Sequence, residues 1–203
     1  MSEQETRAGL PIRAFADAAA WEAWLAAQPR DVPGVWLKLA KKSAGAASVS
    51  KAEAIDGALC HGWIDGQLNP YDEHWWLIRF TPRKPRSIWS ETNRSRAGEL
   101  IAAGRVAAAG QAEIDAAKAD GRWGGAYAPQ STIAMPDDLA TALAAEPGAR
   151  AFFDSLESSN RYAILYRVHE AKKPETRAAR IAKFTGMCAR GERVHQKVDK
   201  AAK

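Results

Sequence analysis

Residues 34–40, Gly-Val-Trp-Leu-Lys-Leu-Ala, and residues 74–80, His-Trp-Trp-Leu-Ile-Arg-Phe, decide the fold of this chain. Within each stretch the core-type side chains recur at every second position, which is typical of a β-strand with one face in the core. Arg79 falls on the second face, together with Trp75 and Leu77. We therefore expect two strands that pair with each other.

Helix signals surround these strands. Asp17 and Ser90 are suitable N-caps, and Ser50 begins an S-x-x-E capping box. Gly62 fits the left-handed position that often follows a helix. From Pro136 onward the pattern is helical throughout. The expected helices span residues 17–28, 50–61, 90–103, 109–120, 136–145, 148–157, 159–172 and 174–189.

This order of elements predicts an α+β fold: a small antiparallel sheet packed with helices, followed by an all-helical C-terminal subdomain. We expect a disordered N-terminus over residues 1–14 and an α+β domain over residues 15–131. The helical subdomain should span residues 132–191, and residues 192–203 should form a basic flexible tail.

Composition narrows the class of protein. The chain has 203 residues, 46% of them hydrophobic, so it can form a core. No apolar run approaches the roughly 18 residues that span a bilayer, and the N-terminal residues are polar, so we expect a cytoplasmic protein without membrane insertion. Cys60 and Cys188 lie far apart, and neither a CxxC nor an HExxH spacing occurs. The sequence thus indicates no disulfide framework, metal site or cofactor.

Positive charge is concentrated in two blocks. Residues 79–105 carry seven basic and two acidic side chains, and residues 150–203 carry 13 and six. Such clustering suits an anionic partner, although a solvated basic face would have the same composition.

Two separated blocks resemble the YdeI/OmpD-associated family, also called bacteriocin-protection proteins. The first block holds Gly62-Trp63-Ile64-Asp65-Gly66, Phe80-Thr81-Pro82-Arg83, and Ser87-Ile88-Trp89-Ser90 with Asn93. The second reads Ala171-Lys172-Lys173-Pro174-Glu175-Thr176-Arg177, followed by Arg180-Ile181. The resemblance implies a link to antimicrobial-peptide tolerance or to an outer-membrane protein, and it implies no known reaction or catalytic set.

Candidate binding residues gather in the first block. Arg83, Lys84 and Arg86 lie in a proline-stiffened turn before a helix, where free N–H groups favour anions. Ser87 adds a hydroxyl, while a solvated basic turn is the alternative. Asp65 can be a structural partner of an arginine, a ligand contact, or a general acid or base.

Three further candidates come from aromatic and amide side chains. Trp63 and Trp89 could offer stacking faces near the basic turn. Asn93 lies on an apolar helical stripe and therefore needs hydrogen-bond partners.

Two arginines of the last helix complete the set. Arg177 shares the stripe of Ile181, Phe184 and Cys188, so it needs a carboxylate from the N-terminal part or an anionic ligand. Arg180 lies beside that stripe.

We therefore expect a non-enzymatic binding protein for an anionic small molecule or peptide, connected to antimicrobial-peptide or stress tolerance. Its pocket would lie between residues 62–93 and the C-terminal helices. Two alternatives are weak nucleic-acid binding through the basic blocks and an enzyme that uses Asp65 as acid or base. No residue is assigned a catalytic role.

Overall fold

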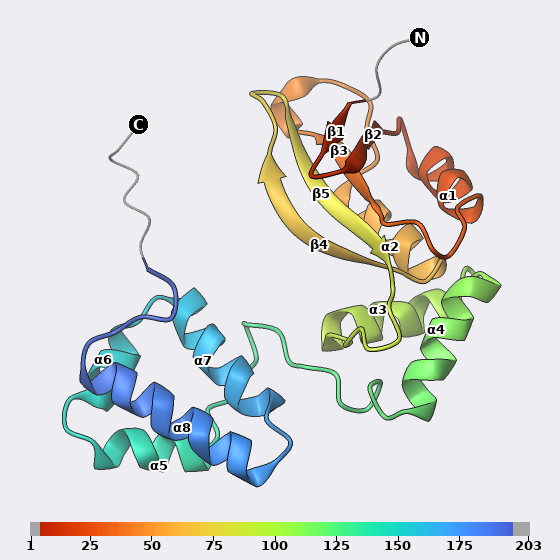
Figure 1. Ribbon diagram of the computed structural model, residues 1–203. Coiled ribbons are helices and arrows are strands. Elements are labelled where there is room, and N and C mark those ends of the chain that lie inside the picture. Colours follow the sequence, from red (N-terminus) through yellow and green to blue (C-terminus); the bar gives the residue numbers. More distant parts are fainter. Residues whose placement is uncertain (1–4, 197–203) are drawn as a thin grey trace. The chain divides into compact units, whose positions relative to one another are not determined.

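The computed structural model describes residues 5–196 and divides into two compact units, Met1–Ala126 and Tyr127–Lys203 (Figure 1). The first unit contains the sheet and four α-helices, and the second is helical. The division lies five residues before the expected boundary at residue 132. Among the described residues, no helix is both long and apolar enough to cross a membrane.

The first unit has a five-stranded sheet with the order β1-β2-β3-β5-β4. β3 and β5 are antiparallel neighbours, which confirms the expected strand pair. β2 runs parallel to β3, so the sheet is mixed rather than purely antiparallel as predicted. The strands are β1 (Thr6–Arg7), β2 (Leu10–Ala14), β3 (Val35–Ala40), β4 (Trp63–Pro70) and β5 (Trp75–Pro82).

The N-terminal segment differs from the expected disorder over residues 1–14, because its described residues include β1 and β2. Leu10 is buried and packs with Trp36 and Leu77, and the Trp36 indole Nε1 donates to the Arg7 carbonyl at 3.0 Å. The prediction of disorder was wrong for Leu10–Ala14 because a strand this short gains its stability from a distant neighbour.

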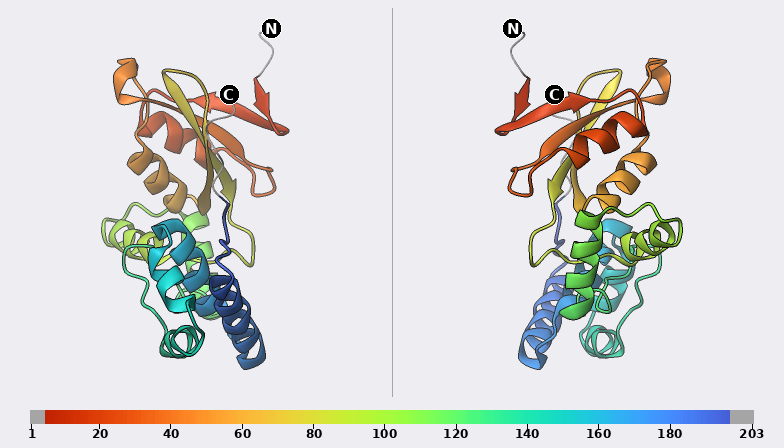
Figure 2. Two further views of the ribbon diagram at one scale, coloured as in Figure 1. Left: turned by 90° about the vertical axis from the view of Figure 1, so that its left-hand side faces the viewer. Right: turned by 90° about the vertical axis from the view of Figure 1, so that its right-hand side faces the viewer.

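The two faces of the sheet have different surroundings. One face carries Leu37, Ile78 and Phe80 and packs against α1 (Ala18–Ala26) and α2 (Lys51–Cys60), which lie on the same side (Figure 2). The other face carries the alternate residues, including Arg79, which is paired across the strands with Trp36. The predicted alternation is therefore confirmed, and it turns Arg79 away from the main core.

The predicted caps are present. Asp17 accepts from the backbone of α1, Ser50 and Glu53 form the capping box of α2, and Ser90 caps α3 (Glu91–Ala102). Gly62 has a φ of 74°, the left-handed conformation expected after α2.

A second core joins α2, α3 and α4 (Ala108–Ala119), and it includes Trp89 and Ile114. Gly110 lets α4 touch the end of α2, because a Cβ there would overlap the Cys60 carbonyl oxygen. A short 3-10 helix, η1 (Lys42–Ala44), follows β3.

The second unit contains four helices close to the predicted ranges, and it has its own core. They are α5 (Asp137–Ala145), α6 (Ala149–Ser155), α7 (Ser158–Glu170) and α8 (Pro174–Ala189). Leu139, Leu143, Ile164 and Phe184 are buried in that core.

The expected flexible tail over residues 192–203 is described only as far as residue 196. Within that part, His195 is tied to α7, because its backbone N–H donates to the Asn160 amide oxygen at 2.8 Å. The Asn160 amide nitrogen donates back to the His195 carbonyl at 3.3 Å. The remainder of the predicted tail lies outside the described residues.

Candidate functional site

A pocket of about 760 Å³ opens in the first unit, where β5 ends and β4 begins. Arg79 and Thr81 come from the face of β5 that points away from Phe80. We call this hollow the Arg79 pocket. Its lining consists of Arg30, Asp31, Val32, Pro33, Gly66, Gln67, Arg79, Thr81, Pro82, Arg83, Lys84 and Pro85.

Local backbone geometry forms the walls of the pocket. Gly34, at a φ of 124°, brings the segment before β3 so close to β5 that a Cβ would lie 2.5 Å from the Phe80 carbonyl oxygen. On the opposite side, the pairing of β4 with β5 is interrupted between Asp65 and Leu68. Gly66 lies in this irregularity and leaves open the space beside the Arg79 side chain.

The turn after β5 forms the third wall. The Arg83 backbone N–H donates to the Gly62 carbonyl at 2.9 Å, which continues the ladder past the end of the strands. The Lys84 backbone N–H donates to the Ser87 hydroxyl at 2.9 Å, and the Ser87 N–H donates to the Lys84 carbonyl at 2.8 Å. This closed turn places the Lys84 side chain at the pocket rim.

Four cations and one carboxylate, Asp31, give the lining an excess of positive charge. Arg30 is engaged by Glu113 and donates to the Ala109 carbonyl at 3.2 Å. Arg83 is buried, with 4% of its surface exposed. Its guanidinium lies 3.5 Å from the Trp89 ring centroid and donates to the Ile88 carbonyl at 3.3 Å. The protein itself therefore holds these two arginines.

The other two cations are available to a ligand. The side chains of Arg79 and Lys84 form no hydrogen bond or ion pair with any residue between 5 and 196. The Arg79 Nε is also shielded from solvent. The Arg79 guanidinium and the Lys84 ammonium therefore belong to the lining of one hollow, and neither is paired with a carboxylate of residues 5–196.

Two expected contact residues lie in the core instead. Trp63, the first residue of β4, is 2% exposed and packs in the main core, and Trp89 is 1% exposed. Trp89 contacts Trp123 with its ring centroid 4.9 Å away, while Arg83 covers its face. These tryptophans support the walls and offer no stacking surface to a partner.

Four other predicted residues lie in the first unit but do not line the Arg79 pocket. Asp65 is half-buried on β4, opposite Phe80. Arg86 is exposed on the turn. The Ser87 carbonyl accepts from Arg122 at 2.7 Å. Asn93 is half-buried in the first turn of α3, where its backbone N–H donates to the Ser90 hydroxyl.

Arg177 and Arg180 belong to the second unit. Arg177 donates to the Asp138 carboxylate at 2.6 and 2.9 Å and to the Val168 carbonyl at 2.9 Å. Its carboxylate partner is therefore on α5 rather than in the N-terminal part as expected. The hydrogen bond from Arg177 lowers the pKa of Asp138 below its usual value. Arg180 donates to the Arg167 carbonyl and to Glu170.

Sequence reasoning thus identified Arg83 and Lys84, and it missed Arg30 and Arg79 as lining residues. A signal for Arg79 was present, since an arginine in a strand between Ile78 and Phe80 must project from the face opposite the core. For Arg30 no such signal exists, because its position depends on α4, about 80 residues later in the chain.

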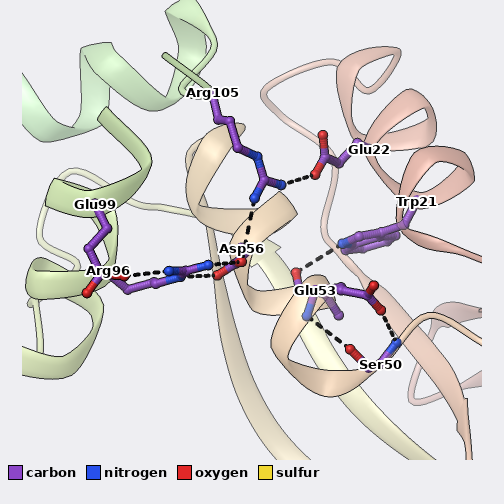
Figure 3. A network of polar contacts seen from close by, with 9 residues as sticks. Trp21, Glu22, Ser50, Glu53, Asp56, Arg96, Glu99 and Arg105 are labelled. Carbon is purple, nitrogen blue, oxygen red and sulfur yellow. Dashed lines mark hydrogen bonds and ion pairs between the residues drawn. The ribbon is translucent and has the colours of Figure 1, made fainter. Parts of the chain in front are cut away.

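A second polar cluster, unforeseen from the sequence, ties α1, α2 and α3 together (Figure 3). Asp56 is buried and receives two hydrogen bonds from Arg96, at 2.7 and 2.5 Å. Figure 3 shows the Arg105 guanidinium between Glu22 and Asp56, at 2.7 and 3.7 Å. Glu22, Asp56 and Glu99 each pair with Arg96 or Arg105, so these ion pairs act as a structural clamp.

No metal centre is formed within the part of the chain that the structure describes. Over residues 5–196, no three His, Cys, Asp or Glu side chains lie close enough together to hold an ion. The thiols of Cys60 and Cys188 are buried, and burial raises the pKa of each. Neither is therefore poised as a nucleophile.

Two family models match separate parts of the chain. Residues 132–191 match the family described as Bacteriocin-protection, YdeI or OmpD-Associated. Residues 13–113 match a Domain of unknown function (DUF8412). No curated protein and no solved structure matches the chain. The match to residues 132–191 supports the resemblance to the YdeI or OmpD-associated family for the C-terminal helical unit.

The two sequence blocks that carried the resemblance fall in different family matches. The block at residues 171–181 lies inside the YdeI or OmpD-associated match. Residues 62–93 lie inside the match to the domain of unknown function. The Arg79 pocket thus lies in the part of the chain for which the comparisons supply no activity.

Proposed function

We propose that the first unit is a binding module for a small organic anion and that the Arg79 pocket is its site. The observation that carries this proposal is the Arg79 side chain, whose shielded Nε has no hydrogen-bond partner among the described residues. A buried polar group left unpaired costs about 1–3 kcal/mol, and more when the group is charged. A bound anion would recover that cost.

The chemistry of the lining suggests which anions fit. A guanidinium binds carboxylate or phosphate oxygens in a two-pronged geometry, and the Lys84 ammonium adds a second cation that can follow the ligand. Val32 and three prolines provide apolar contact for an organic body. Asp31 at the rim disfavours a long polyanion, which argues for a compact ligand over nucleic acid.

The lining supports binding rather than catalysis. Its titratable residues are four cations and Asp31, and it contains neither a histidine nor a cysteine. Asp65, the expected acid or base, lies outside it. A role in antimicrobial-peptide or stress tolerance also belongs to this proposal, and its support is the description of the family that matches the second unit.

A thermal-shift screen at constant ionic strength tests the site. The panel contains phosphate, pyrophosphate, citrate, nucleoside monophosphates and a single-stranded oligonucleotide. A hit at a hundredfold excess over its Kd should raise Tm by on the order of 10 °C. Arg79→Gln should abolish that rise. The matched control is Arg13→Gln, which removes the same charge from an exposed position on β2.

An equal loss of the Tm shift in Arg79→Gln and Arg13→Gln would contradict the proposal, because nonspecific charge attraction would then explain the binding. An oligonucleotide hit that weakens steeply with salt and survives Arg79→Gln would favour the nucleic-acid alternative instead.

A further inference from the structure

The second unit has a hollow of its own, a shallow groove of about 700 Å³ between α5 and α8. We call it the α5–α8 groove. Along α8 it extends from Pro174 to Gly186, which at the helical rise corresponds to about 18 Å. Small or apolar side chains predominate in its lining: Asp138, Ala142, Glu146, Pro174, Arg177, Ala178, Ile181, Ala182, Thr185 and Gly186.

The α8 wall carries a second apolar stripe, distinct from the stripe that fills the core. Phe184 and Cys188 face the core of the unit. Ala178 and Ala182 lie one turn apart, and both are exposed to solvent. Side chains this small let another helix approach closely, because they form almost no ridge. The groove therefore has the length and floor that suit a docked helix.

Thr185 is an independent sign that the groove is incomplete. Only 8% of Thr185 is exposed, and its hydroxyl makes no hydrogen bond within the described chain. Most buried polar side-chain atoms have a hydrogen-bond partner, and a helical threonine can bond to a carbonyl of the preceding turn, so an unpaired hydroxyl in a groove wall is unusual. A polar group on a docked partner would supply the missing bond.

Charge indicates the chemistry of that partner. Asp137, Asp138 and Glu146 are the charged residues from 137 to 146, so this segment carries three negative charges and no positive one. Arg177 neutralises Asp138 at one end. Glu146 is exposed at the other end, beside the negative end of the α5 dipole, with no ion pair among residues 5–196. This acidic end favours a cation.

We propose that the α5–α8 groove binds an amphipathic helix with a basic polar face, contributed by another polypeptide. The apolar face of the helix lies on Ala142, Ala178 and Ala182, and a lysine or arginine pairs with Glu146. This is the helix-in-groove mode of peptide recognition. The inference is independent of anion binding in the first unit.

The test uses two fluorescein-labelled peptides of identical length in fluorescence anisotropy with the full chain. Both carry leucines at i, i+3, i+4 and i+7, and the polar face is lysine in one and glutamate in the other. We expect the lysine peptide to bind and the glutamate peptide to bind at least about tenfold more weakly, because like charges would meet.

Two matched alanine variants locate the site. Ala182→Trp fills the groove and should weaken binding at least about tenfold, as expected for an obstructed anchor position. Ala179→Trp adds the same side chain at an exposed α8 position outside the groove and should leave binding unchanged. Circular dichroism checks that both variants fold.

Glu146→Gln tests the charge arm and should weaken binding of the lysine peptide alone. Equal loss with Ala182→Trp and Ala179→Trp, or failure of the lysine peptide to bind, would overturn the proposal. Concentration-dependent sedimentation that Ala182→Trp abolishes would show that a second copy occupies the groove, and this would also overturn it.

Discussion

Arg79 and Thr185 each line a hollow with a buried polar atom that has no hydrogen-bond partner among the described residues, and the two atoms differ in chemistry. The Arg79 Nε belongs to a permanent cation, whereas the Thr185 hydroxyl is neutral. A neutral group can be replaced by an apolar one of the same shape with a gain in stability. A permanent cation with an unpaired buried nitrogen lowers the stability of the fold unless a ligand pairs with it. The binding proposal therefore rests on Arg79.

Thr185→Val should increase the free energy of unfolding by about 1 kcal/mol, because it removes a buried hydroxyl that has no partner. Thr141→Val is the control, since the Thr141 hydroxyl donates to the Asp137 carbonyl at 2.8 Å. Urea titration should show a higher midpoint for the first variant and no gain for the second. A loss of stability in Thr185→Val would mean that the hydroxyl is satisfied in solution.

Asp138 makes the second unit sensitive to acid. Its hydrogen bonds from Arg177 lower its pKa in the folded chain. A carboxyl with a lowered folded-state pKa contributes stability above its unfolded pKa, near 3.9, and that contribution disappears as the pH falls through the folded value. Asp138→Asn should therefore lower the urea midpoint at pH 7, and the difference from wild type should shrink progressively as the pH falls below about 4.

Asp137→Asn provides the comparison, because Asp137 is exposed and has no ion pair in the described part of the chain. It removes the same charge from the first turn of α5 without breaking an ion pair, so its deficit at pH 7 should be smaller than that of Asp138→Asn. A deficit in Asp138→Asn that is independent of pH would show that the ion pair is not the cause.

At the scale of elements, the absence of a side chain at Gly110 lets α4 approach the end of α2 closely. The Ala107 backbone N–H donates to the Cys60 carbonyl at 3.0 Å, and Gly110 has no room for a side chain against that carbonyl. This contact fixes α4, whose Glu113 engages Arg30 at the pocket. The pocket wall thus depends on a glycine that lies outside the pocket.

Gly110→Ala should destabilise the chain by about 1–3 kcal/mol, because the added methyl group would clash with α2. The higher helix propensity of alanine would offset only part of this cost. Gly98→Ala on α3 is the matched control, since a Cβ there meets nothing within 4 Å. That variant should gain about 0.5–1 kcal/mol from reduced chain entropy. Thermal unfolding measures the change in stability of each variant. Equal changes in Gly110→Ala and Gly98→Ala would refute the close contact between α4 and α2.

Elements with strong local signals could be predicted from the sequence. Asp17, Ser50 and Ser90 cap the helices assigned to them, because capping depends on residues three positions apart. β2 could not be predicted, since it is stabilised by parallel pairing with β3 about 24 residues later. The Asp56–Arg96 clamp was missed for the same reason, because its partners are 40 residues apart.

At the scale of the whole molecule, the two units have separate cores. Core residues of the second unit, such as Leu143 and Phe184, pack with one another, and those of the first unit gather on the sheet and around α4. From the sequence we expected a helical subdomain over residues 132–191, because the pattern is helical throughout from Pro136 onward. Arg83 and Arg177 were expected to line one pocket, and each is held by groups of its own unit.

Separate cores predict that the units fold independently. Fragments 1–126 and 127–203 should each show the helical circular dichroism of its part of the full chain and a cooperative thermal transition. A fragment 127–203 that lacks a transition would show that the second core is insufficient alone.

The most direct test of the central claim blocks the Arg79 pocket without changing its charge. A side chain at residue 66 would begin 3.9 Å from the Arg79 Cβ, an ordinary contact, and would then extend into the pocket. Isothermal titration calorimetry with the strongest anion from the screen compares wild type with Gly66→Val. We expect Gly66→Val to weaken binding at least about tenfold while every cation remains. Unchanged affinity in Gly66→Val would place the anion outside the Arg79 pocket and contradict the proposed site.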